Sequence, residues 1–204
     1  MTGTPHRAES VDGSGHELLV LHLQADDRQP AELLSLTALP VDHLGTAGCC
    51  LRWTVQPVRP LSAALVHKLK IRPDEQAAAR PWEDLAVDVA TALGTRPVVV
   101  LQGWREFCLL ERYLPGWRPD QVYSVSRLAQ RLGRRAEITA AWSDADCPDA
   151  ARVSLLHQLL AELVTGGHHT WAVALDMAAL PLGRYQPEHR VRARPAAANT
   201  EPPR

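Results

Sequence analysis

Residues 18–41 read LLVLHLQADDRQPAELLSLTALPV, and this stretch decides the fold class of the 204-residue chain. Two apolar runs of strand length, residues 18–24 and 33–41, flank the polar residues 26–30. Asp, Gln and Pro between two apolar runs are typical of a turn. The stretch therefore predicts an antiparallel hairpin.

A third strand is expected over residues 49–56, where Leu51, Trp53 and Val55 alternate with polar residues. Strict alternation predicts one covered face and one exposed face, and a position near the edge of the sheet. Residues 97–101 form a short apolar run that suits a buried strand.

Three later segments show helical spacing. After Pro81 the apolar residues recur every fourth position, until Gly94 ends the pattern. A second helix follows residues 97–101, and a third begins at Pro148. Their apolar stripes are Leu85, Val89 and Leu93; Phe107, Leu110 and Leu114; and Val153, Leu156, Leu160, Leu163 and Val164. Residues 170–176, TWAVALD, favour an additional strand, with a helix start as the alternative. The order of strands and helices predicts an α/β fold.

These segments resemble, in the same order, the motifs of proofreading-type 3'-5' exonucleases of the DEDD superfamily, over roughly residues 18–164. The family's first strand carries Asp and Glu where this chain has His22 and Gln24. VHKL (66–69) is similar to the family's connection after the third strand. LQGWREF (101–107) is similar to the second motif, with Glu106 at its Asp position and Leu101 and Gln102 at its His and Asn positions.

The resemblance extends to two further segments. VYSVSRLAQRLGR (122–134) is similar to the family's next segment, with Tyr123-Ser124 in place of Asp-Thr. DAARVSLLHQLLAELV (149–164) resembles the third-motif helix. There Ala151 stands at the catalytic His position and Leu156 at the final Asp position.

The resemblance implies a ribonuclease H-like three-layer α/β fold, with a mixed central sheet of about five strands flanked by helices. It also implies a mechanism in which carboxylates hold two divalent metals. Of the four acidic positions only Glu106 keeps a carboxylate, so we expect no cofactor, and Mg²⁺ or Mn²⁺ only if nuclease activity remains. Asp26 and Asp27 could compensate as ligands, although polar turn residues are the simpler interpretation.

Nucleic-acid-binding candidates lie in two segments. The resemblance puts Trp104 and Arg105 beside the cleft for the last nucleotides, where they could stack on a base and meet a phosphate. The alternative is a tryptophan that covers the helix start. Lys68 and Lys70 belong to the local basic segment HKLKIR (67–72), which could line the same cleft or form a solvated loop.

Three functions follow. The first, slightly favoured, is a catalytically degenerate exonuclease fold that binds single-stranded nucleic acid. The second is a protein-interaction or regulatory subunit that uses the filled cleft. The third is an active metal-dependent 3'-5' exonuclease with rearranged ligands.

Composition is compatible with one soluble domain and two extensions. The formal net charge of -1 gives no global field that attracts a polyanion, so nucleic acid would need a local basic patch. We expect a flexible extension over residues 1–15, an exonuclease-like domain over 16–186 and a disordered basic tail over 187–204. Four irregularly spaced cysteines and the absence of a long apolar run predict a cytoplasmic protein with no membrane segment; the sequence leaves the oligomeric state open.

Overall fold

A computed structural model describes residues 16–26, 30–42, 45–144 and 149–182. One five-stranded sheet runs through this part of the chain in the order β3-β2-β1-β4-β5. The pairs β3-β2 and β2-β1 are antiparallel, whereas β1-β4 and β4-β5 are parallel, so the sheet is mixed as predicted. The strands are β1 (His16–Ala25), β2 (Leu33–Asp42), β3 (Leu51–Thr54), β4 (Val98–Val100) and β5 (Val122–Ser124).

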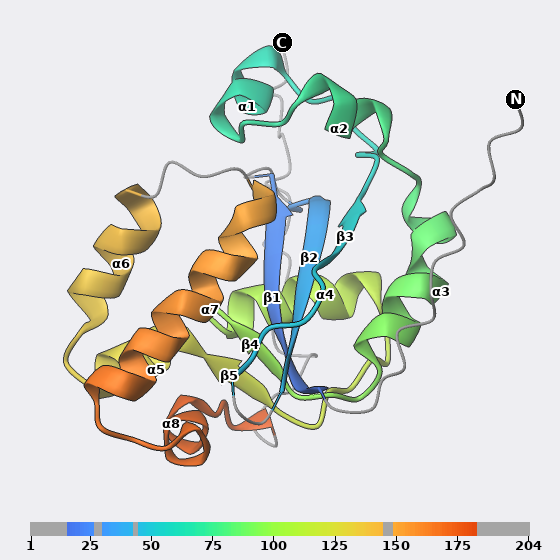
Figure 1. Ribbon diagram of the computed structural model, residues 1–204. Helices are drawn as coiled ribbons and strands as arrows, with labels where there is room; N and C mark the ends of the chain where they lie inside the picture. The colour runs from blue at the N-terminus through green and yellow to red at the C-terminus, as the bar shows by residue number, and fades with distance from the viewer. Residues whose placement is uncertain (1–15, 27–29, 43–44, 145–148, 183–204) are drawn as a thin grey trace, which may run out of the picture.

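Helices surround the sheet (Figure 1). They are α1 (Ala63–Lys68), α2 (Pro73–Ala77), α3 (Trp82–Leu93), α4 (Trp104–Tyr113), α5 (Val125–Arg131), α6 (Arg135–Asp144), α7 (Asp149–Gly166) and α8 (Trp171–Ala178). None of the helices in the described ranges is long and apolar enough to cross a lipid bilayer. The expected extensions, residues 1–15 and 187–204, lie outside the described residues.

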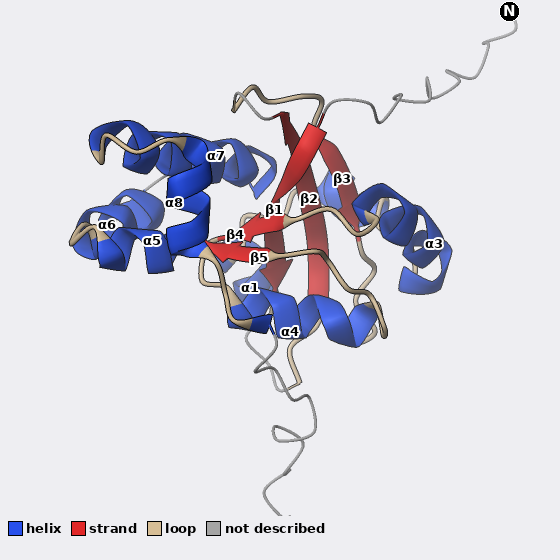
Figure 2. Ribbon diagram, turned by 90° about the horizontal axis from the view of Figure 1, so that it is seen from below, coloured by secondary structure: helices blue, strands red, loops and turns tan. Residues whose placement is uncertain are grey.

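The sheet separates two apolar cores, which gives three layers. Leu19 and Leu21 of β1 face α3 and α4, while Leu18 and Val20 face α5, α6, α7 and α8. Figure 2 shows these two helical groups on either side of the strands. Successive side chains of a strand point to opposite faces, so β1 serves both cores and is buried over residues 18–21.

The predicted hairpin is confirmed, and its register places the first-motif residues. His22 lies opposite Thr37, and Gln24 lies opposite Ser35. His22 and Gln24 follow Leu18 and Val20 at even spacing along β1, so their side chains lie on the same side of the sheet, which faces α7. Thr37 and Ser35 of β2 lie beside them on that side. The face is therefore apolar where β1 begins and polar where β1 ends.

The three predicted helical stripes are confirmed. The apolar residues named for α3, α4 and α7 are all buried. Gly94 follows α3 with φ 54° and ψ -141°, a conformation that favours glycine, so the helix ends there. Pro148, the expected start of α7, lies outside the described residues.

Two strand predictions need correction. The third strand is shorter than residues 49–56, and all four residues of β3 are half-buried, without a covered and an exposed face. The reason is that helix α2 lies against the face of β3 that was expected to be exposed. On that face, Arg52 Nη1 of β3 pairs with Glu75 Oε1 of α2 at 2.7 Å. The edge position of β3 is confirmed.

Residues 170–176 do not form a strand. They belong to helix α8, whose N-cap Thr170 accepts a hydrogen bond from Val173 N through its Oγ1. Ala174 and Ala178, four residues apart, face the core and are buried. The β-branched and aromatic residues suggested a strand, but the cap and the small residues at helical spacing allow close packing on α5.

Candidate functional site

A cleft of about 190 Å³ lies where β1 and β4 end. Its polar lining comes from His22 on β1 and from Gln102, Arg105 and Glu106 at the start of α4. The rest of the lining is apolar: Leu21, Leu23, Ala25, Leu101, Leu109 and Trp142. The structure therefore brings together the first-strand motif and the second motif, although 84 positions separate His22 from Glu106.

His22 is held by aromatic packing. Its ring meets Trp142 of α6 edge to face, with 5.4 Å between the ring centroids. The guanidinium of Arg152 lies 4.9 Å from the Trp142 ring, and Arg152 Nη1 donates to Trp142 O at 2.9 Å. An aromatic and cationic cluster thus adjoins His22, which stands at the aspartate position of the motif that this strand resembles.

Gln24 makes a contact between two segments of the backbone. Its Nε2 donates to Leu69 O at 2.9 Å, which ties the residues after α1 to the end of β1. Lys68 and Lys70 flank Leu69 and are exposed, so both lie at the cleft end of the sheet, where Figure 1 shows α1 above β1. Neither lysine is among the residues that line the cleft.

Glu106 is the one carboxylate in the cleft lining. Its Oε1 accepts a hydrogen bond from Gln102 N at 3.0 Å, while its Oε2 is buried and has no hydrogen-bond partner in the described chain. Burial raises the pKa of Glu106, and backbone N–H groups and Arg105 offset part of that rise. The environment therefore favours the neutral carboxyl more than an exposed site would.

The third-motif positions lie outside the cleft. Leu156 is fully buried in the core between the sheet and helices α5 to α8. Ala151, near the start of α7, is exposed. Leu156 therefore contributes packing, and no side chain of α7 reaches the described cleft lining.

Asp26 serves the hairpin turn. It is fully buried, and its Oδ1 accepts a hydrogen bond from Glu32 N at 2.7 Å. Its Oδ2 lies 3.9 Å from Arg59 Nη2. This geometry agrees with the turn interpretation, and Asp26 does not line the cleft. Asp27, the other compensating candidate, lies outside the described residues.

The two second-motif candidates have different surroundings. Arg105 is exposed and lines the cleft. Trp104 packs beside Phe107, with ring centroids 6.0 Å apart, against the core on the α3 and α4 side. Trp104 thus covers the helix start, and the tryptophan at the cleft is Trp142. Sequence reasoning missed Trp142 because it lies on α6, in a segment without a motif.

The donor set does not fit a two-metal centre. Two divalent cations of the magnesium type need several carboxylate oxygens between them. The cleft offers one carboxylate, from Glu106, with one imidazole and one amide. Throughout the described ranges, no three His, Cys, Asp or Glu side chains are grouped so that they could hold a metal ion.

No protein-family model and no curated protein sequence matches the chain. Solved structures do. Exonuclease X in complex with 5' overhanging duplex DNA superposes with a TM-score of 0.52 and 15% identity, over 79% of this chain and 99% of that one. The fold is that of the DEDD-type exonucleases.

Two further structures agree. A 3'-exonuclease described with a histone mRNA stem-loop has a TM-score of 0.57 and 12% identity, over 76% of this chain and 84% of that one. Pop2p of S. pombe, in a form with bound Mg²⁺ and Mn²⁺, has a TM-score of 0.56 and 9% identity, over 74% and 83%. At these identities the likeness shows the ribonuclease H-like fold, and the expected fold class is confirmed.

Proposed function

We propose that this protein is a catalytically degenerate exonuclease-fold protein that binds single-stranded nucleic acid at the remnant cleft. The loss of hydrolysis is inferred from the cleft lining, in which Glu106 is the single carboxylate. His22 packs on Trp142, Gln24 bonds to Leu69 O, and Leu156 lies in the core. The side chains that stand where the exonuclease motifs have acids therefore make packing or backbone contacts in this chain.

Basic groups at the cleft end of the sheet support the binding part of the proposal. Arg105 is exposed on the cleft lining, and Lys68 and Lys70 are exposed beside the end of β1. Because the chain has a formal net charge of -1, attraction of a phosphate backbone would depend on such local groups. His22 and Trp142 add aromatic surface of the kind on which bases stack.

The distribution of exposed apolar side chains favours nucleic acid over a protein partner. Among the described residues, the large exposed hydrophobic side chains are Val58, Val87 and Val173. They belong to three separate segments: the chain after β3, helix α3 and helix α8. A protein-binding face would be expected to gather such side chains into one patch.

Binding of the full chain to labelled single-stranded DNA and RNA over a salt series tests the proposal. We expect binding that weakens with salt. Arg105→Gln, Lys68→Gln and Lys70→Gln should each reduce the salt slope by about 0.7, the value for one phosphate neutralised on a single strand. Arg131→Gln, an exposed arginine of α5 outside the cleft lining, is the matched control and should leave the slope unchanged. No binding at low salt would overturn the proposal and favour a protein partner.

A second arm of the experiment examines hydrolysis. The labelled strands are incubated with Mg²⁺ or Mn²⁺, and their lengths are measured. We expect no shortening. Metal-dependent shortening that Glu106→Gln abolishes would contradict the proposal and establish an active exonuclease with rearranged ligands.

A further inference from the structure

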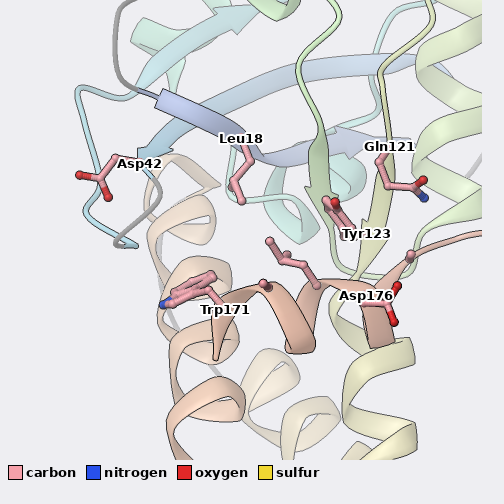
Figure 3. Close-up of a pocket in the computed structure, with 9 residues that line it drawn as sticks. Leu18, Asp42, Gln121, Tyr123, Trp171 and Asp176 are labelled. Carbon is pink, nitrogen blue, oxygen red and sulfur yellow. The ribbon is translucent and has the colours of Figure 1, made fainter. Parts of the chain in front are cut away.

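Two cavities outside the cleft differ in their lining. The larger, about 560 Å³, lies beside α8, and its lining includes Leu18, Tyr123 and Trp171 (Figure 3). Asp42 and Asp176 stand at its rim, and in Figure 3 their carboxylates point away from its middle. The smaller is a groove of about 310 Å³ on the α3 and α4 side of the sheet. This groove combines aromatic rings with an exposed carboxylate.

Three segments that are far apart in sequence form the groove. Pro57 and Val58 follow β3, Pro81 and Trp82 stand at the start of α3, and Tyr113 ends α4. Val58 is 92% exposed, so one wall of the groove presents an apolar side chain to water. A segment that covers this wall would remove apolar surface from water, which favours binding.

The two aromatic side chains are fixed by hydrogen bonds with the backbone. Trp82 Nε1 donates to Tyr113 O at 2.9 Å, and Tyr113 Oη accepts from Leu33 N at 2.8 Å. The two rings meet edge to face, with centroids 5.2 Å apart and an interplanar angle of 76°. A tyrosine hydroxyl that accepts one hydrogen bond can still donate its own hydrogen to a peptide carbonyl. Proline-containing segments dock on aromatic-lined grooves of this kind.

The charged residues of the groove are acidic. Glu32 and Glu83 belong to the lining, and no lysine or arginine is among its described lining residues. Glu32 is already paired with Arg59. Glu83 is exposed in the first turn of α3, and its neighbour Asp84 is exposed as well. The groove therefore favours a segment that brings a cation next to an apolar residue.

The chain itself contains such a segment beyond the described residues. Residues 190–195 read RVRARP, in which Arg194 directly precedes Pro195. The described chain ends at Leu182, which packs on the same core as Trp82 and Tyr113. Residues 183–204 therefore start from the side of the sheet on which the groove lies.

The distance to the groove is within reach of these residues. A Cβ at Gly103 would lie 2.8 Å from Leu180 Cδ1, so the end of the described chain is near the start of α4. The groove lies at the other end of α4, whose 10 residues correspond to about 15 Å. Residues 183–193 can span up to about 36 Å. Tethering gives an effective concentration in about the millimolar range, so a weak contact is enough for docking.

We propose that the groove binds the Arg194-Pro195 segment of the chain's own tail. In this arrangement Pro195 packs on Trp82 and Val58, and Arg194 pairs with Glu83. A residue before proline is biased towards extended backbone, which reduces the entropy that the segment loses on docking.

Limited trypsin digestion of the full chain, without nucleic acid, tests the proposal. The rate of cleavage after Arg192 is measured by mass spectrometry relative to cleavage after Arg7. Docking protects the bond after Arg192, so the rate follows the undocked fraction. We expect Glu83→Gln to raise it about threefold, as for an exposed ion pair. Val58→Ser should raise it as well, because it removes apolar surface from the wall.

Glu162→Gln is the matched control, since Glu162 is an exposed carboxylate of α7 on the other side of the sheet (Figure 2). It should leave the rate unchanged. An equal increase by Glu162→Gln and Glu83→Gln would show unspecific attraction between the tail and the acidic surface, and would overturn the proposal.

A double variant tests the pairing of the two residues. Arg194→Gln should raise the rate as Glu83→Gln does, and the combination should raise it no further, because both substitutions remove one pair. Each rate is divided by that of the isolated peptide 187–204 with the same residue at 194. Equal rates in the full chain and the peptide would overturn the proposal, as would independent effects of the two substitutions. Protection that is lost on dilution would place the tail on a second copy and overturn docking within one chain.

Discussion

Restoring an acid at the third-motif position should unfold the protein. Leu156 is fully buried in the core beneath α7. Replacing a buried leucine by a small residue costs about 3–5 kcal/mol, and burying a polar group without a partner adds about 2–7 kcal/mol. We therefore expect Leu156→Asp to lower the free energy of unfolding by at least about 5 kcal/mol, the lower end of the total stability of an ordinary domain.

Urea denaturation followed by far-UV circular dichroism measures this loss, with Leu156→Ala as the comparison that separates the cavity from the buried acid. Ala151→Asp is the surface control: residue 151 is exposed in the first turn of α7, where an acid is favoured by the helix dipole. It should change the free energy of unfolding by less than about 0.5 kcal/mol.

A Leu156→Asp variant as stable as Leu156→Ala would contradict the burial of residue 156 in the core. Selective stabilisation of Leu156→Asp by Mn²⁺ would contradict it as well, since the position would then face a metal-binding cleft. Either result would mean that α7 presents residue 156 to the cleft in solution.

Three further results are expected. Gln24→Ala should cost about 1 kcal/mol and speed amide hydrogen exchange after α1, because the variant cannot donate to Leu69 O; unchanged exchange there would contradict the proposed anchoring. Glu106→Gln should raise the free energy of unfolding at pH 7, since burial raises the folded-state pKa of Glu106 and the ionised form is penalised. The gain in the free energy of unfolding should shrink as the pH falls to the ordinary pKa range of a glutamate, where the wild-type side chain is protonated. Urea denaturation at several pH values measures this gain. Ultraviolet titration, with Tyr123→Phe to assign the signal, should give a raised pKa for Tyr123 that Asp176→Asn lowers; an unchanged titration would show that the carboxylate does not act on the hydroxyl.

The hairpin and helices α3, α4 and α7 were predictable because their local patterns agree with their burial. The hairpin of β1 and β2 follows from two apolar runs and a polar turn, and Gly94 ends α3 as expected. The error at residues 170–176 has a local cause as well. The β-branched and aromatic residues of this segment favour a strand, whereas the cap at Thr170 and the helical spacing of Ala174 and Ala178 favour the helix that forms.

The candidate site was predictable only in part. The motif register brought His22 and Glu106 to one cleft, and the structure places both in its lining. The contact of Trp142 with His22 could not be foreseen, because α6 and β1 are far apart in sequence and no motif joins them. Trp104, by contrast, turned out to belong to the core on the α3 and α4 side.

The sequence by itself determined the hairpin of β1 and β2 and the apolar stripes of α3, α4 and α7, since these depend on short-range spacing. It also determined that His22, Gln24 and Leu156 stand where the resembled motifs have acids. Only the tertiary structure decided what those replacements do: Gln24 anchors α1, and Leu156 fills a core. It alone also brought Asp42, Tyr123 and Trp171 around one cavity. The physical reason is that burial, hydrogen-bond partners and electric fields depend on neighbours in space, which chain connectivity does not specify.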